Sequence, residues 1–215
     1  DPIEYIKRKA RFVYPLFKKI FTKADFIQTI SRYLADFARS MGYKGGLEVV
    51  PNGVDINQFS IFPPSPKLCG TSNFQFSIKD LKNELGIKND EKVVITVSRL
   101  VKKNAVDDII KSLKYLPLNV KLLILGDGPD ENSSKSLARE LGLEKRIFFL
   151  GQIGHEDLPK YLAMADIFIR PSLSEGLGIS FLEAMAAGLP IIATPVGGIV
   201  DFLRDGETGL FCKVR

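Results

Sequence analysis

Among 215 residues the sequence has two cysteines, Cys69 and Cys212, and one histidine, His155. Two separate cysteines provide no disulfide framework and no cluster of metal ligands, which favours a reducing compartment. No apolar run approaches the length needed to cross a bilayer, and no cleavable signal peptide is visible. The ordinary apolar content therefore predicts a cytoplasmic globular protein with one domain or parts of two.

The positive charge is concentrated at the start of the chain. The net charge is +5, and residues 1–30 hold seven lysines and arginines against three acidic residues, which leaves +1 for the rest. Apolar side chains recur among these cations at helical spacing: Ile6, Ala10, Val13, Phe17 and Ile20. Such a segment either contacts anionic lipid at a membrane surface or packs on its own domain with a solvated basic face. Pro15 is expected to kink or divide it, and nucleic acid is not an expected partner.

The next segment predicts a small strand–helix–strand unit followed by a linker. Strands are expected at 24–30 and 47–50, and between them a helix over 32–41 that Ser31 caps. Residues 60–77 are rich in proline, serine and other turn-forming residues, which is typical of a linker. A domain boundary is therefore expected there.

Apolar strands alternate with helices from Glu91 onward. Strands are predicted at 93–97, 122–125, 147–150, 167–169, 191–194 and 210–212, with helices in between. This alternation predicts an α/β fold whose parallel sheet is covered on both faces. Ligands of such sheets bind beyond the carboxyl ends of the strands. Because no G-x-G-x-x-G follows the first strand, an oxidoreductase that uses a nicotinamide cofactor is disfavoured.

Glu175 and Glu183 stand eight residues apart in a stretch that follows an apolar strand and opens an alanine-rich helix. A helix N-terminus favours a phosphate, and Gly176 and Gly178 remove side chains that would block its approach. Carboxylates on both sides of such a site suit a ligand with hydroxyls on both sides of a diphosphate, namely a nucleotide-sugar. The spacing alone leaves open a second interpretation, two solvated glutamates at a helix start.

The same stretch resembles family 4 of the retaining glycosyltransferases, enzymes of GT-B type with two facing Rossmann-like domains. The resemblance follows six stretches in order over most of the chain: Val49–Asp55, Val97–Asn104, Gly126–Pro129, Phe149–Ile153, Ser174–Gly188 and Thr194–Ile199. It implies transfer of a sugar, with retention, from a nucleoside-diphosphate donor to a saccharide, lipid or small-molecule acceptor, without a further cofactor.

The resemblance also implies a domain organisation. Residues 1–56 would be the tail of an N-terminal acceptor domain with its hinge, residues 57–90 a linker with a Pro/Ser-rich insertion, and residues 91–215 a C-terminal donor-binding domain, truncated at its end. Because most of the acceptor domain is absent, this chain is expected to bind the donor but to transfer no sugar on its own.

Three residues are assigned to catalysis by the resemblance. Arg99 and Lys103 would hold the donor diphosphate, where fixed cations stabilise the charge that grows on the leaving group, and Lys102 could replace Lys103. Glu175 would contact hydroxyls of the donor sugar. No Asp-x-Asp occurs in the chain, so no metal clamp is expected.

Further residues are assigned to donor binding. Glu183 would hold the ribose diol, backbone N–H groups of Gly178, Ile179 and Ser180 would face the sugar or diphosphate, and Gln152 and Ile153 would contact the base. The turns Gly126–Pro129 and Gly197-Gly198 are expected to be structural, as strand ends require such residues. His155 is expected to have a loop or capping role, not a catalytic one.

Two other functions remain open at this point. A nucleotide-sugar epimerase of the same two-domain build would change the configuration of the sugar without moving it. A non-catalytic nucleotide-sugar-binding module would bind the donor and do no chemistry.

Overall fold

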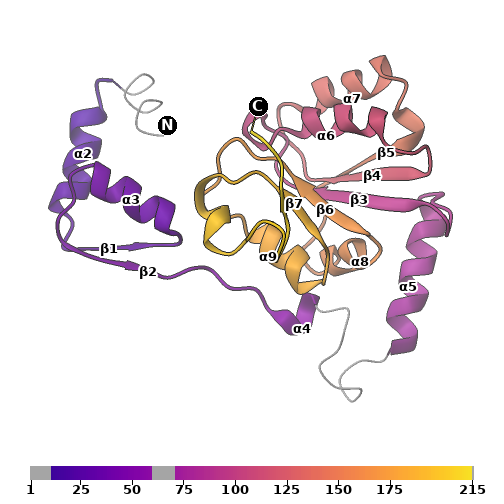
Figure 1. The fold of residues 1–215 in the computed structure, drawn as a ribbon, viewed down its shortest axis with the longest axis horizontal. Helices are drawn as coiled ribbons and strands as arrows, with labels where there is room; N and C mark the ends of the chain where they lie inside the picture. The colour runs from indigo at the N-terminus through magenta and orange to yellow at the C-terminus, as the bar shows by residue number, and fades with distance from the viewer. Residues whose placement is uncertain (1–10, 60–70, 215) are drawn as a thin grey trace.

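The computed structural model describes residues 11–59 and 71–214, which contain two parallel sheets (Figure 1). The smaller sheet has two strands, β1 (Phe26–Thr29) and β2 (Gly46–Val49), joined by helix α3 (Arg32–Ser40). The Ser31 hydroxyl caps α3 by accepting a hydrogen bond from the backbone N–H of Leu34 at 3.3 Å. The predicted strand–helix–strand unit is therefore confirmed; together with the preceding helix we call it the N-terminal unit (residues 14–49).

Helix α2 (Tyr14–Lys23) carries the described part of the predicted basic segment, and residues 1–10 lie outside the described residues. Pro15 lies in its first turn, where a missing backbone N–H breaks no intrahelical hydrogen bond. Residues 11–13 form a turn and regular helix begins only at Tyr14; because residues 1–10 lie outside the described residues, the division of the basic segment at Pro15 stays a prediction. None of the described helices is long and apolar enough to cross a membrane.

The predicted linker, residues 57–90, is partly helical. Helix α4 (Ile56–Phe59) begins at its start, and helix α5 (Thr71–Glu84) occupies residues expected to lack regular structure. Ile78 and Leu81 of α5 pack against the main core, which explains why this part is helical despite its turn-forming neighbours. The Pro-rich stretch and Cys69 lie outside the described residues, and the domain boundaries stay predictions.

The larger sheet has six parallel strands, which confirms the predicted α/β fold. They are β3 (Lys92–Val97), β4 (Val120–Leu125), β5 (Ile147–Gly151), β6 (Ile167–Arg170), β7 (Ile191–Ala193) and β8 (Leu210–Phe211). Their order is β5-β4-β3-β6-β7-β8. The chain runs outward from β3 to β5 and then returns to the other side of β3 as β6. The strand order therefore reverses between β3 and β6, the kind of position where open α/β sheets bind ligands.

Helices cover both faces of this sheet (Figure 1). On one face lie α6 (Val106–Ser112) and α7 (Glu131–Glu140), and on the other lie α8 (Leu158–Ala163) and α9 (Ile179–Ala186). Alternate residues of β4 enter the two cores, with Leu122 on the α6 side and Leu123 on the α9 side. Short 3-10 helices complete the connections: η1 (Lys102–Asn104), η2 (Leu113–Tyr115), η3 (Glu144–Arg146) and η4 (Gly197–Asp201).

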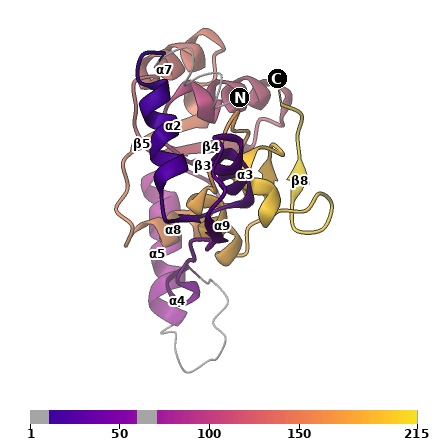
Figure 2. The same ribbon diagram turned by 90° about the vertical axis from the view of Figure 1, so that its left-hand side faces the viewer.

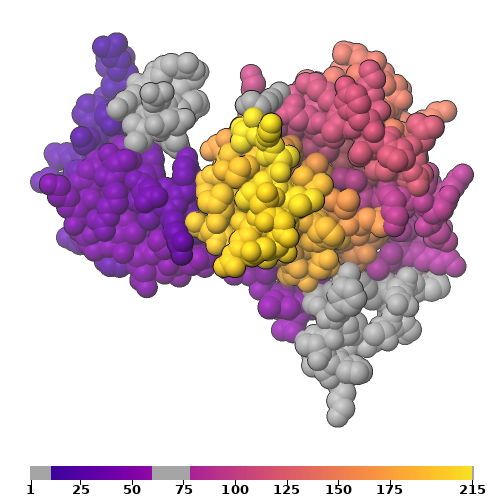
Figure 3. All heavy atoms as spheres, viewed as in Figure 1, coloured from indigo at the N-terminus to yellow at the C-terminus, as the bar shows by residue number. Residues whose placement is uncertain are grey.

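The N-terminal unit meets the main domain beside the loop that follows β6. The backbone N–H of Arg32, at the start of α3, donates to the Asp201 carboxylate of η4 at 2.7 Å. Figure 3 shows the N-terminal unit beside the C-terminal segment of the chain, while Figures 1 and 2 show α4 and α5 extending from the same end of the molecule. The N-terminal unit therefore lies against the edge where the predicted site residues emerge.

Candidate functional site

Two loops meet at the reversal point of the sheet. One follows β3 and carries Arg99 and Lys103, and the other follows β6 and carries Glu175. Since the carboxyl ends of parallel neighbours lie at the same edge, the loops are adjacent, and the backbone N–H of Leu173 donates to the Lys103 carbonyl at 2.6 Å. The structure thus places on adjacent loops the three residues to which the resemblance assigns catalysis.

The side chains of Arg99 and Lys103 are exposed above this edge. Within the part of the chain that the structure describes, neither cation forms a side-chain hydrogen bond or ion pair. The loop itself is fixed, because the Asn104 amide donates to the Arg99 carbonyl at 2.7 Å. Two cations on an ordered loop, without carboxylate partners of their own, form a surface suited to an anion.

Glu175 is largely buried and its carboxylate is already hydrogen-bonded. Oε2 pairs with the guanidinium of Arg170, and Oε1 accepts from the backbone N–H of Gly176 at 3.0 Å. The strand predicted at 167–169 ends just before Arg170, and the sequence suggested no role for this residue. A charged residue at the carboxyl end of an otherwise apolar strand was the available signal.

Glycines bring the Glu175 loop close to its neighbours. Gly178 has a φ of 87°, and a Cβ atom there would lie 2.6 Å from the Phe181 ring and 3.2 Å from Glu175 Cγ. A Cβ on Gly197 would lie 1.7 Å from the Glu175 carbonyl oxygen. Only glycine fits at both positions, which agrees with the structural role predicted for Gly197-Gly198.

Helix α9 begins directly after Gly178 with Ile179 and Ser180. Its first turn carries backbone N–H groups that have no partner within the helix, as at any helix start. The Ser180 hydroxyl accepts from Arg170 Nη1 at 2.8 Å, so this side chain is engaged while the backbone of the turn borders the two loops. The predicted anion site at this helix start therefore lies next to Glu175.

Glu183 lies one turn further into α9 and is buried, with 6% of the residue exposed. Its Oε1 is 3.2 Å from Nε2 of His155. Burial raises the pKa of the Glu183 carboxyl, and the hydrogen bond from His155 opposes the rise. His155 lies in a turn as predicted, but its side chain contacts a predicted site residue, which the prediction of a mere loop or capping role missed.

His155 contacts α4 and Glu183 through its two ring nitrogens. Gln58 Nε2, on α4, lies 3.2 Å from the His155 carbonyl oxygen and 3.1 Å from its Nδ1. A carbonyl only accepts, so the amide nitrogen of Gln58 is the donor and Nδ1 is an acceptor. The tautomer with its proton on Nε2 fits both contacts, with Nδ1 accepting from Gln58 and Nε2–H donating to Glu183.

Gln152 and Ile153 follow β5, two strands away from the reversal point on the β4 side. The Gln152 amide donates to the carboxylate of Asp127, in the turn after β4, at 3.0 Å. Ile153 is partly buried and packs against the core. The structure places these two residues on the same edge as Arg99, separated from it by the turn after β4.

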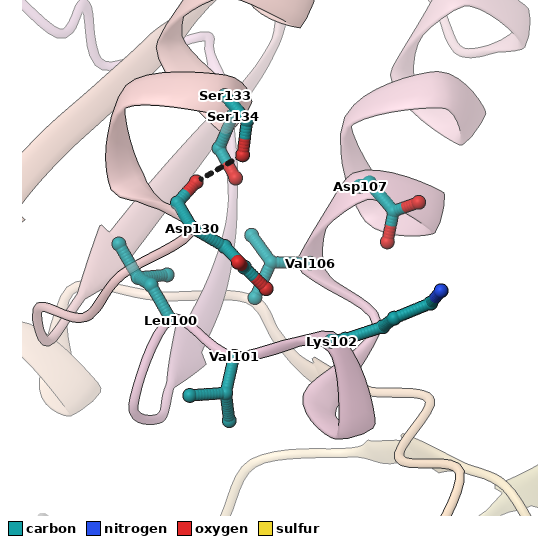
Figure 4. Close-up of a pocket in the computed structure, with 8 residues that line it drawn as sticks. All are labelled: Leu100, Val101, Lys102, Val106, Asp107, Asp130, Ser133 and Ser134. Carbon is teal, nitrogen blue, oxygen red and sulfur yellow. Dashed lines mark hydrogen bonds between the residues drawn. The ribbon is translucent and has the colours of Figure 1, made fainter.

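A cavity of about 270 Å³ lies on the other side of the β3 loop, between α6 and α7 (Figure 4). Its lining comprises Leu100, Val101, Lys102, Val106, Asp107, Asp130, Ser133 and Ser134. Two carboxylates against one lysine make it a poor site for a diphosphate. Lys102 lines this cavity, whereas the backbone of Lys103 is bonded to the Glu175 loop, so the two lysines are not equivalent.

Residues 77–215 match the family described as glycosyl transferases group 1. The chain belongs to this family. Among curated proteins it is 33% identical over 203 residues to the GDP-mannose-dependent alpha-(1-6)-phosphatidylinositol monomannoside mannosyltransferase of Mycolicibacterium smegmatis, covering 89% of this chain and 50% of that protein. It is 37% identical over 143 residues to the N-acetyl-alpha-D-glucosaminyl L-malate synthase of Bacillus anthracis, covering 66% of this chain and 37% of that protein.

Two solved structures illustrate the fold that this group 1 chain shares with other proteins. The Anabaena protein HepE in complex with UDP-glucose matches with a TM-score of 0.81 and 25% identity, covering 96% of this chain and 55% of HepE. A C-terminal domain of a group 1 glycosyl transferase from Francisella tularensis matches with a TM-score of 0.60 and 26% identity, covering 76% and 81%. The family and the GT-B fold expected from the resemblance are confirmed, and the chain spans about half the length, or less, of the curated relatives it matches.

Proposed function

We propose that this chain is the donor-binding part of a glycosyltransferase that uses a nucleoside-diphosphate sugar. The observation that carries the proposal is the meeting of exposed Arg99 and Lys103 with the start of α9 at the point where the strand order reverses. Positive side chains and a helix N-terminus both favour a diphosphate there. Relatives named for GDP-mannose dependence and a structural neighbour holding UDP-glucose support this choice of ligand.

In the proposed reaction the bond between the anomeric carbon and the diphosphate breaks while the acceptor oxygen bonds to the same carbon from the same face, which retains configuration. The acceptor proton passes to an oxygen of the departing phosphate. Arg99 and Lys103 stabilise the negative charge that develops on that phosphate. Glu175 accepts hydrogen bonds from the sugar hydroxyls, Glu183 from the ribose, and Gln152 and Ile153 border the base.

A thermal-shift panel of UDP-, GDP- and ADP-sugars tests this proposal. A ligand that binds only the folded chain raises the melting temperature by mass action. At least one series should raise it, and the double substitution of Arg99 and Lys103 by alanine should abolish the rise. No shift with any of the three series, at concentrations into the millimolar range, would refute donor binding.

A second proposal concerns α2, which we propose contacts an anionic membrane surface. Phe12 is 97% exposed, and Leu16 and Ile20 are each 63% exposed, next to Lys19 and Lys23. Apolar side chains flanked by cations suit the interface of anionic lipid. The chain should sediment with vesicles containing anionic lipid and be released as salt rises, whereas Leu16→Ser with Ile20→Ser should stay in solution. Equal recovery with neutral vesicles, or none with either, would contradict membrane contact.

A further inference from the structure

Arg170 is a buried cation at the centre of the candidate site. It is the last residue of β6 and is 8% exposed. A charge in this position is costly unless it is paired and hydrogen-bonded. Its guanidinium lies over the Phe181 ring, 5.3 Å from the ring centroid, and its two terminal nitrogens bond to three different segments of the chain.

Each of those three segments contributes to the proposed donor site. Nη2 donates to the Asn104 amide oxygen at 3.2 Å and to Glu175, and Nη1 donates to the Ser180 hydroxyl at 2.8 Å. Asn104 in turn donates to the carbonyl of Arg99. One guanidinium thus joins three segments: the loop after β3 that carries Arg99 and Lys103 (the diphosphate loop), the loop that carries Glu175, and the first turn of α9. A lysine offers donors on one nitrogen only, so it has no equivalent of this planar fork.

The pairing also determines what Glu175 offers a ligand. A carboxylate has about four lone-pair positions, and Arg170 and the Gly176 N–H occupy two of them. The remaining positions of the carboxylate can only accept hydrogen bonds, so they are open to hydroxyl donors. Glu175 is therefore held in one orientation as an acceptor for hydroxyl groups.

We propose that Arg170 is a positioning residue that aims the Glu175 carboxylate at the donor sugar and ties it to the diphosphate loop. This inference rests on the proposed function. It makes the affinity for the sugar part of the donor depend on a residue that does not touch the sugar.

The test compares affinities for a nucleoside diphosphate and its sugar derivative by calorimetry, with UDP and UDP-glucose or GDP and GDP-mannose as probes. The quantity measured is the dissociation constant of the plain nucleoside diphosphate divided by that of the nucleotide-sugar. Weaker binding of the sugar part lowers this ratio. If neither pair binds the wild-type chain, the proposed function fails and the inference fails with it. If one pair binds, the variants alone decide the inference.

Arg170→Lys should weaken the nucleotide-sugar about tenfold more than the plain nucleotide, the size of one lost charged hydrogen bond. In a Glu175→Gln background the same substitution should leave the ratio almost unchanged, because the two residues act together. An unchanged ratio in Arg170→Lys, or an undiminished effect in the Glu175→Gln background, would overturn the proposal.

Arg146 provides a matched control. It is also 8% exposed, and it donates to the carbonyls of Leu116, Pro117 and Val120 near the start of β4, at the opposite edge of the sheet. Arg146→Lys should lower the melting temperature and leave the affinity ratio as in wild type. A change of ratio as large as that of Arg170→Lys would identify the effect as general loss of structure and overturn the proposal.

Ser180→Ala keeps the inference testable if Arg170→Lys does not fold. Alanine is a good helix former, and the change removes one hydrogen bond from Arg170 while the Glu175 pair remains. It should reduce the ratio by a smaller factor, again only when Glu175 is present. An unchanged ratio would count against the proposal.

Discussion

Glu175 and Glu183 belong to one motif, and their side chains are almost equally shielded, with 11% and 8% exposed. Their surroundings nevertheless differ. Glu175 is paired with Arg170, a permanent cation, whereas Glu183 contacts the ring of His155 while burial raises the pKa of its carboxyl. Spacing in the sequence places both carboxylates at one helix, but partners 5 and 28 residues away set their charge and orientation.

The largest expected difference between the two glutamates is in folding stability. Glu175→Ala leaves the buried Arg170 without its counter-charge and should lower the free energy of unfolding by about 3–5 kcal/mol. Glu183→Gln keeps the size of the side chain and removes a charge that burial disfavours. This substitution should therefore not lower the free energy of unfolding. Urea denaturation at pH 7 measures both, and equal losses would contradict the contrast.

The second largest difference between Glu175 and Glu183 is expected in ligand affinity. Glu183→Ala should weaken nucleoside diphosphate and nucleotide-sugar alike, because both carry the ribose. Glu175→Gln should weaken only the nucleotide-sugar. Loss of a hydrogen-bonding partner costs about 1–3 kcal/mol, roughly 5- to 150-fold in affinity. Calorimetry with both ligands measures these affinities. If both variants weaken binding of the plain nucleotide equally, the assignment of Glu183 to the ribose and Glu175 to the sugar is contradicted.

The exposed cations should behave like Glu183 in this assay. Arg99→Ala should weaken the nucleoside diphosphate and the nucleotide-sugar by the same factor, about tenfold or more, because both ligands carry the diphosphate. Lys103→Ala should do so to a smaller extent. Lys102→Ala is the matched control, because Lys102 lines the cavity on the other side of the loop. Unchanged affinity in Arg99→Ala would remove that residue from the site.

The smallest expected effect concerns pH. Because the pKa of Glu183 is raised in the folded chain, the folded state favours its protonated form, and its ionisation costs stability as pH rises through that pKa. Glu183→Gln should therefore melt higher than wild type at pH 7, and the difference should vanish as pH falls below the usual range for glutamate. Melting curves from pH 4 to 8 provide the measurement. If the difference in melting temperature between the variant and wild type grows in acid, the pKa of Glu183 is not raised and the prediction is wrong.

The parallel sheet could be predicted from the sequence because each strand is a short apolar run between turn residues, as in Val93–Val97 and Leu122–Leu125. The order of the strands is not contained in that pattern. The return of the chain from β5 to β6 depends on how the helices pack, so the adjacency of Arg99 and Glu175 came from the resemblance and not from periodicity.

Contacts between distant residues were the least predictable part of the site. Arg170 reaches Asn104, 66 residues earlier, and His155 joins Gln58 to Glu183 across 97 and 28 residues. Nothing local in the sequence specifies these partners, because they depend on the three-dimensional arrangement of loops. The helix α5 was missed for a similar reason, since the core that stabilises it lies elsewhere in the chain.

The position of α4 has a consequence for the reach of the N-terminal unit. Phe59 is 1% exposed in the main core, and Gln58 is hydrogen-bonded to His155, so α4 is anchored on the main domain. Between the end of β2 and the start of α4 the chain has residues 50–55, which span about 20 Å when fully extended. The length of residues 50–55 therefore limits how far β2 can move away from the main domain while α4 stays in place. Any rearrangement larger than that length requires Phe59 to leave the core first.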